Sequence, residues 1–256
     1  MTFLFSKNFP PAAFVILLLL LGLQVSFGSP QRATYSAKHS AANKRPGATG
    51  PQFVDVTRAS GIDFHLTCGG PEKRYIMESM CGGVAVLDYD NDGWLDILLV
   101  DGSTLEDFHS GKCPRPKVYR NNQDGTFTDV SAKAGLTRCG WGFGVAIGDY
   151  DNDGWEDVYI TYLDGGALYH NNHDGTFGDV TAKAGVDNGG RWGTSAAFGD
   201  YDNDGNLDLY VVNYVTLDLE HLPEFGNGPF CQYRGIPVSC GPRGIKGSRD
   251  HIYHNN

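Results

Sequence analysis

Short apolar runs that flank loops rich in Asp and Gly dominate the chain from Phe53 onward. Residues 84–87 form one apolar run directly before such a loop, and residues 97–100 form another directly after it. Runs of four mostly aliphatic residues are too short for helices and are typical of strands. The pattern therefore predicts a strand, an acidic loop and a second strand. The same unit recurs twice downstream.

A second pattern alternates with the first. Residues 119–136 read as a hairpin: a strand that begins at Tyr119, an Asn-Gln-Asp-Gly turn, and a return strand of the form Thr-Phe-x-Asp-Val. Asn/Asp-Gly turns of this kind join antiparallel strands. The hairpin recurs at residues 169–186, and its opening recurs at 253–256. Its closing half also occurs early, at residues 53–62.

Together the two patterns give four strands per repeat, with a period of about 50 residues. Units of four strands and this length are typical of propeller blades. We therefore expect an all-β fold, a β-propeller of four-stranded blades, with a solenoid as the alternative. About three blades are expected, at residues 82–131, 142–181 and 193–256, the third without its last strand. Residues 53–62 would be the last strand of a preceding blade. Because a ring needs at least about four blades to close, the chain is expected to be a fragment of a longer propeller.

The connections between the second and third strands differ in length. The first and third are longer than the second, and the third contains the largest insertion, residues 216–250. Since all of them leave the same position of a blade, we expect them on one face. Grouped insertions are where repeat proteins usually bind partners.

The acidic loops predict a metal site. Each has Asp at positions 1, 3, 5 and 9, Gly at position 6, and a position-7 residue whose carbonyl is a further ligand. Calcium takes six to eight oxygen ligands, many of them carboxylate. The predicted ligands are Asp88, Asp90, Asp92, Trp94 and Asp96 in loop 1; Asp149, Asp151, Asp153, Trp155 and Asp157 in loop 2; and Asp200, Asp202, Asp204, Asn206 and Asp208 in loop 3. About three Ca²⁺ ions are expected, with Mg²⁺ as the less suitable alternative because all-protein oxygen cages favour calcium.

An EF-hand shares positions 1, 3, 5 and 6 but also needs Glu at position 12. Here position 12 is Leu99, Ile160 or Val211, and strands rather than helices flank the loops. The EF-hand interpretation therefore fails.

The charge distribution restricts the possible partners, and the cysteines indicate an exported protein. Five of the 20 basic residues and none of the 30 acidic residues lie in residues 1–50, which leaves residues 51–256 with a net charge of −15. Such an acidic body disfavours nucleic acid and anionic membranes as partners. The six cysteines allow 15 complete pairings in an oxidising compartment. Cys231 and Cys240 share one insertion and are the preferred pair.

The first 52 residues predict a targeting segment and a linker. Lys7, an apolar run at residues 12–23 and small residues before position 29 are typical of a signal peptide, residues 1–28. A membrane anchor is the alternative, but the run is shorter than the roughly 20 residues that a span needs. Residues 29–52 are rich in Ala, Ser, Lys, Gly and Pro and predict a disordered linker. No membrane span is expected after signal removal. The expected location is secreted, periplasmic or cell-surface.

Two tryptophans and two histidines are weaker candidates for further sites. Trp141 and Trp192 each lie eight residues before the first Asp of a loop, where packing between blades is favoured over ligand binding. His170 and His173 flank the second hairpin turn, but His-x-x-His on a surface turn is by itself a weak metal signal.

The Asp-x-Asp-x-Asp-Gly-x-x-Asp loops between strands resemble the FG-GAP or VCBS repeats of integrin-α-type β-propellers. Combined with Tyr-x-Asn-Asn-x-Asp-Gly-Thr-Phe-x-Asp-Val, they are similar to the bacterial ASPIC/UnbV proteins, related to cartilage acidic protein. The resemblance covers residues 53–256 and implies a seven-bladed propeller with calcium in its loops. The remaining blades and the C-terminal segment of that family are absent from the sequence.

Two functions follow as hypotheses. The first is a non-enzymatic calcium-binding scaffold that holds a protein or glycan ligand on its insertion loops, as an adhesion module does. The second is a calcium-dependent, lyase-like enzyme acting on polysaccharides. The sequence has no serine-hydrolase, zinc-protease or phosphate-loop signature, so no catalytic residue is assigned.

Overall fold

The computed structural model describes residues 50–256. The predicted signal peptide, residues 1–28, and residues 29–49 of the predicted linker lie outside the described part. Within residues 50–256, no helix is long and apolar enough to cross a membrane.

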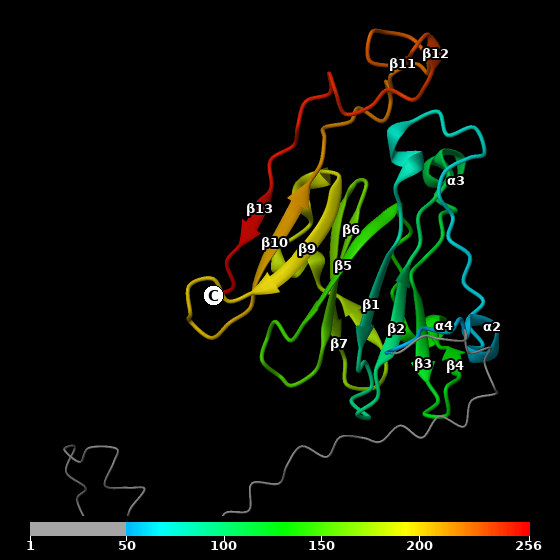
Figure 1. Cartoon of the computed structure of the whole chain (residues 1–256). Coiled ribbons are helices and arrows are strands. Elements are labelled where there is room, and N and C mark those ends of the chain that lie inside the picture. The colour runs from blue at the N-terminus through cyan, green and yellow to red at the C-terminus, as the bar shows by residue number, and fades with distance from the viewer. Residues whose placement is uncertain (1–49) are drawn as a thin grey trace, which may run out of the picture. The chain divides into compact units, whose positions relative to one another are not determined.

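Three antiparallel sheets form the framework, two of four strands and one of three (Figure 1). The first has the order β1-β2-β3-β4, the second β5-β6-β7-β8, and the third β13-β10-β9. The strands are β1 Gly83–Leu87, β2 Asp96–Val100, β3 Lys117–Asn121, β4 Phe127–Asp129, β5 Gly142–Gly148, β6 Asp157–Tyr162, β7 Gly165–Asn171, β8 Phe177–Asp179, β9 Gly193–Gly199, β10 Asp208–Asn213 and β13 His251–Tyr253. The fold is thus mostly β, as the sequence predicts, with four antiparallel strands in each complete repeat.

Apolar side chains between neighbouring sheets form the core. Val100 and Val118 of the first sheet pack with Ile160 and Tyr169 of the second. A separate cluster joins the second sheet to the third. Each such fully buried aliphatic side chain contributes roughly 1.5–3 kcal/mol relative to its exposed state. The packing keeps successive sheets side by side and aligns their loops.

Strand β5 approaches β9 so closely that only glycine fits at one point. A Cβ at Gly144 would lie 2.7 Å from the carbonyl oxygen of Thr194 and 2.8 Å from the Cα of Ser195. The lack of a side chain at Gly144 therefore sets the spacing between the second and third sheets.

Short helices, which the apolar pattern does not reveal, occupy the connections. One-turn helices follow the last strands of the first two sheets, and each ends at a glycine in the left-handed region, which is a common helix stop. Four residues are too few to show a helical period. The helices are α2 Thr57–Ser60, η1 Ile76–Ser79, α3 Leu105–Ser110, α4 Ser131–Ala134, α5 Thr181–Ala184 and η2 Asn188–Gly190.

The expectation of a strand at the start of residues 53–62 is wrong. Residues 53–56 form no strand, although α2 follows them as α4 follows β4. Phe53 is fully exposed. In the complete sheets the equivalent residues pair with a preceding hairpin strand, as β4 pairs with β3. Residues 53–56 have no such neighbour among the described residues, so the same sequence pattern leaves them unpaired.

The insertions pack together at the end of the sheets opposite the acidic loops (Figure 1). Helix α3 contributes Leu105 and Phe108 to a cluster around Trp141 and Trp192, and the third insertion contributes Leu217 and Ile245. Both tryptophans are buried, which confirms packing over an exposed binding role. The third insertion also holds a small hairpin, β11 Gln232–Tyr233 and β12 Ile236–Pro237.

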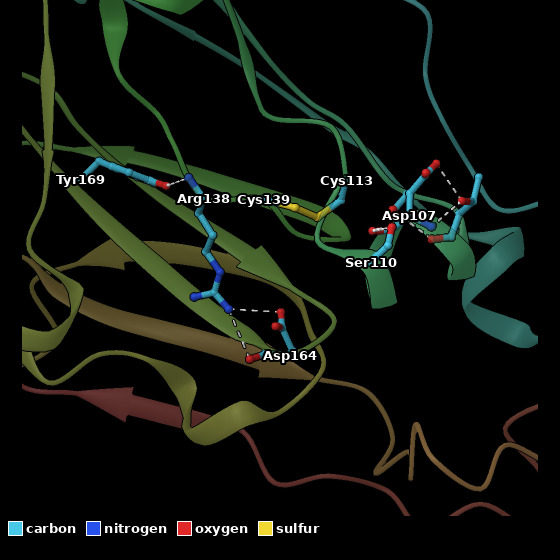
Figure 2. Close-up of a disulfide and its surroundings, with 9 residues drawn as sticks. Asp107, Ser110, Cys113, Arg138, Cys139, Asp164 and Tyr169 are labelled. Carbon is cyan, nitrogen blue, oxygen red and sulfur yellow. Dashed lines mark hydrogen bonds and ion pairs between the residues drawn. A yellow bond between two sulfur atoms is a disulfide. The ribbon is translucent and has the colours of Figure 1, made fainter.

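Three disulfides fasten the insertions and the segment before β1. Cys231 pairs with Cys240, as predicted, within the third insertion. Cys68–Cys81 and Cys113–Cys139 complete the set. Figure 2 shows Cys113, just after α3, joined to Cys139 in the connection that leads to the second sheet. The neighbouring Arg138 donates to Asp164, and its backbone N–H donates to the Tyr169 hydroxyl, which holds this connection against β7 (Figure 2).

Candidate functional site

The three acidic loops connect β1 to β2, β5 to β6, and β9 to β10. Each turns through two left-handed residues, Asn at position 4 and Gly at position 6. Asn tolerates this conformation better than most side chains, and Gly adopts it without steric cost. The residues are Asn91 and Gly93, Asn152 and Gly154, and Asn203 and Gly205. The local sequence thus closes each loop around its carboxylates.

The position-1 aspartate organises the turn. In loop 1 the Asp88 carboxylate accepts the N–H of Asp92 at 2.9 Å and that of Gly93 at 2.8 Å. Asp92 in turn accepts the N–H of Trp94 at 3.0 Å. The same three bonds recur in loops 2 and 3. The repeated sequence therefore produces a repeated geometry.

The position-9 aspartate begins the second strand and is buried. Asp96 accepts the N–H of Tyr89 at 3.1 Å and that of Asn121, in the hairpin, at 2.7 Å. Burial is the main reason that the pKa of Asp96 rises to about 6, and the neighbouring Asp90 and Asp92 add to it. Burial likewise raises the pKa of Asp157 to about 6. The pKa of Asp208 is lowered instead, first by the N–H of Asn255.

Within residues 50–256, the position-3 aspartate accepts no hydrogen bond from a backbone N–H of its own loop. In loop 1, Asp90 Oδ1 is buried without a hydrogen-bond partner, while Oδ2 accepts Arg120 Nε at 2.7 Å. A buried carboxylate oxygen without a partner is costly unless a cation or a donor meets it. In loop 1, Asp90 Oδ1 is therefore available to an ion.

Carboxylates of each loop converge. Asp88, Asp90 and Asp96 in loop 1, and Asp149, Asp151 and Asp153 in loop 2, each bring three ligand atoms within 4.8 Å of one another. In loop 3, Asp202 and Asp204 converge with His254. Anionic oxygens at this density repel one another, and a hard divalent cation removes the repulsion. The donor set and the partnerless Asp90 oxygen fit calcium. The carbonyls of Trp94, Trp155 and Asn206 remain predicted ligands.

Basic and amide residues of the hairpins face the loops, a placement that the sequence pattern does not predict. Arg120 contacts Asp90 and Asp92, and Gln123 Nε2 donates to Asp92 at 3.1 Å. At the equivalent positions of the second hairpin stand His170 and His173. The third has His254, 3.0 Å from Asp208. The repeated Tyr-x-Asn-Asn motif was the available signal, because its second residue is basic or imidazole in all three copies.

Hydrogen bonds also join loops 1 and 2 to the repeat that follows each of them. The buried Asn171 side chain donates to the Tyr89 carbonyl of loop 1 at 2.8 Å. Asn255 likewise donates to the Tyr150 carbonyl of loop 2 at 2.7 Å. Glu156 of loop 2 accepts the N–H of Asp88 at 2.7 Å. The three loops are therefore one connected edge.

The comparison with protein families agrees with this geometry. A family model described as FG-GAP-like repeat matches residues 88–160 and 151–211, which contain all three loops. The repeats are similar to FG-GAP repeats. The matched stretches each begin at or within one acidic loop and extend past the next, so the FG-GAP signal follows the strand–loop–strand units described above. No curated protein matches the chain.

Proposed function

We propose that the chain is a calcium-binding repeat protein of a secreted, periplasmic or cell-surface location, and that it acts as a scaffold for a protein or glycan ligand. The observation that carries the calcium assignment is the threefold recurrence of one aspartate-rich turn, with the same hydrogen bonds to its position-1 aspartate, at the same place in three neighbouring sheets. The FG-GAP-like match supports it. The three disulfides support an oxidising compartment.

Within this proposal the sheets at residues 82–131, 142–181 and 193–256 are blades of a β-propeller of the ASPIC/UnbV, cartilage-acidic-protein-like type. Sheets that pack side by side in chain order support a propeller. About one Ca²⁺ per loop would neutralise the converging carboxylates, held by Asp at positions 1, 3, 5 and 9. Because the loops are already joined by Asn171, Asn255 and Glu156, an ion in each would stiffen the whole edge of the sheets.

The proposed ligand surface is the face that the insertions form. A hollow there is lined by Glu72, Arg74 and Tyr75 from the segment before β1, and by Glu224 and Phe225 from the third insertion. Tyr and Phe beside charged groups suit the recognition of sugars and peptides. A binding role is proposed over catalysis because the sequence repeats an ion-binding pattern three times and carries no serine-hydrolase, zinc-protease or phosphate-loop signature.

Calorimetric titration of calcium into chelator-treated protein tests the ion sites. We expect about three ions per chain. At a calcium concentration 100 times the dissociation constant, each site stabilises the fold by about 2.7 kcal/mol. Asp90→Asn or Asp202→Asn should remove about one ion each, since neither position carries backbone bonds of its loop. Asp124→Asn, in a hairpin turn where the carboxylate accepts only from Thr126, is the matched control. Absence of calcium binding by the wild-type chain would refute the assignment.

The ligand face is tested with arrays of immobilised glycans and extracellular-matrix proteins, in calcium. Phe225→Ala should abolish any specific binding, whereas Leu95→Ala, at another exposed apolar side chain that lies in an acidic loop, should leave that binding unchanged. Incubation with uronate polymers covers the lyase hypothesis. Unsaturated products that are detected by ultraviolet absorbance, and that are lost in Asp202→Asn, would refute the scaffold hypothesis in favour of the lyase hypothesis.

A further inference from the structure

The second acidic loop differs from the first in what its hairpin presents to it. Residues 119–123 and 169–173 occupy equivalent positions, but Arg120 and Gln123 of the first correspond to His170 and His173 of the second. Arg120 and Gln123 only donate hydrogen bonds to Asp90 and Asp92. A guanidinium has no acceptor and cannot ligate a metal, whereas a neutral imidazole can. The same fold therefore places hydrogen-bond donors beside loop 1 and possible metal ligands beside loop 2.

The two imidazoles converge on the loop 2 carboxylates. His173 Nε2 lies 2.6 Å from Asp153 Oδ2. His170 Nδ1 lies 3.3 Å from Asp151 Oδ2 and 3.3 Å from Asp157 Oδ1. This nitrogen is buried and makes no hydrogen bond to either oxygen. A buried ring nitrogen that lies near two carboxylates but is hydrogen-bonded to neither indicates that a further group, such as a metal ion, lies between them.

The spacing suits a small ion. Asp153, His170 and His173 each offer one ligand atom, and these atoms lie within 4.8 Å of one another. Ligands bound at about 2.0–2.2 Å in a tetrahedron are about 3.3–3.6 Å apart. Side-chain rotations that move the ligand atoms by about 1 Å would therefore close the set around an ion. Two His and one carboxylate leave a fourth position for water or Asp151.

Neighbouring aromatic rings and backbone bonds hold the imidazoles in place. Trp155 stacks on His173 with ring centroids 4.8 Å apart and an angle of 15° between the planes. Tyr150 meets His170 edge-on at 6.2 Å. The backbone N–H of His173 donates to Asn171 Oδ1 at 3.1 Å. Rings that are oriented before the ion arrives favour tight binding.

Nitrogen ligands select the metal. Calcium binds almost entirely to oxygen, whereas imidazole suits zinc, copper, nickel and iron. We infer that loop 2 and the β7–β8 hairpin form a mixed nitrogen and oxygen site for a transition-metal ion such as Zn²⁺, with His170, His173 and Asp153 as ligands. Loop 1, with Arg120 and Gln123, remains an oxygen site. Loop 3 has a single imidazole among the described residues, His254.

Zinc titration of untagged, chelator-treated protein in saturating calcium tests the site, with bound metals counted by mass spectrometry. We expect one Zn²⁺ per chain, and we expect bound Ca²⁺ to fall from about three ions to about two, because Zn²⁺ takes Asp153 in place of the Ca²⁺ proposed for loop 2. The double change His170→Arg with His173→Gln, which copies loop 1 into loop 2, should weaken zinc binding by at least about 100-fold, the upper end of the loss seen for outer-shell partners alone. The reciprocal Arg120→His with Gln123→His should create a second zinc site. His221→Ala, which removes an exposed imidazole elsewhere, should change neither count.

Trp155 supplies a second readout. Because it stacks on His173, Cu²⁺ should quench part of the tryptophan fluorescence at one equivalent, and Trp155→Phe should remove that part. If the double variant does not fold, the single change His173→Gln, at a partly exposed side chain, replaces it in the test. Zinc bound no more tightly by the wild type than by the His variants would overturn the inference. That result would leave calcium in the oxygen loops intact, and absence of calcium binding would leave the zinc site intact.

Discussion

Asn171 offers the sharpest test of how the loops are joined. It is fully buried at the end of β7. Its side-chain amide donates to the Tyr89 carbonyl in the neighbouring loop at 2.8 Å and to the Glu156 carbonyl at 3.3 Å. Its Oδ1 accepts the N–H of His173. Asn171→Ala removes all three bonds and keeps the backbone bond to Asp157.

The expected cost follows from burial. A buried polar group that loses its partner costs about 1–3 kcal/mol. The Tyr89 carbonyl is the buried partner here, and the weaker or more exposed bonds add less, so we expect Asn171→Ala to lower the free energy of unfolding by about 3 kcal/mol. For a domain of this size that corresponds to a fall in Tm of about 6–12 °C.

Asn121 is the matched control. It occupies the same place in the first hairpin and makes the equivalent exposed bonds, to the Leu95 carbonyl and from the Gln123 N–H, but among the described residues it makes no bond to a neighbouring repeat. We expect Asn121→Ala to cost about 1 kcal/mol, the net worth of an ordinary hydrogen bond. Both variants are compared with the wild type by urea unfolding and calorimetry in chelator, so that ion binding does not contribute. Equal losses in the two variants would refute the conclusion that Asn171 joins one repeat to the next.

Three further predictions concern packing, cross-links and ionisation. Gly144→Ala should lower the free energy of unfolding by about 1–3 kcal/mol, because the added methyl group overpacks against β9. Gly199→Ala, where a Cβ would meet open space, should lower it by less than about 1 kcal/mol. Equal unfolding midpoints for the two variants would contradict this prediction. Replacing Cys113 and Cys139 by Ala removes a disulfide between residues 26 apart in sequence and should lower the free energy of unfolding by about 3.5 kcal/mol. Replacing Cys231 and Cys240, which are 9 apart, should lower it by about 2.6 kcal/mol, because a shorter loop restricts the unfolded chain less. The opposite order in urea unfolding would contradict this explanation. Burial, with the bond to Asp63, raises the pKa of Tyr119 to about 12. The stability that its neutral form contributes is therefore complete below pH 10 and lost between about pH 10 and 12, by about 2–3 kcal/mol; Tyr119→Phe should flatten this part of the stability–pH curve, and an unchanged curve would disprove the assignment.

Much of the local structure follows from sequence because its causes are local. Asn and Gly at fixed places in the acidic loops permit their left-handed turns, and the apolar runs beside them are long enough only for strands. The position of β1, β2 and the loop between them is therefore readable from residues 84–100. The same local logic fails at residues 53–56, because a strand needs a partner and the pattern does not say whether one is present.

The sequence by itself determined that three acidic loops join pairs of strands, and it favoured the pairing of Cys231 with Cys240 because the two share one insertion; the structure confirmed that pairing. Only the tertiary structure decided which side chains face those loops. Arg120 lies 30 residues from Asp90 along the chain, and His173 lies 20 from Asp153; sheet register, not sequence spacing, brings them together. The same holds for the bond from Asn171 to Tyr89, 82 residues apart. The three loops share one sequence pattern, and the packing of the sheets makes their surroundings different.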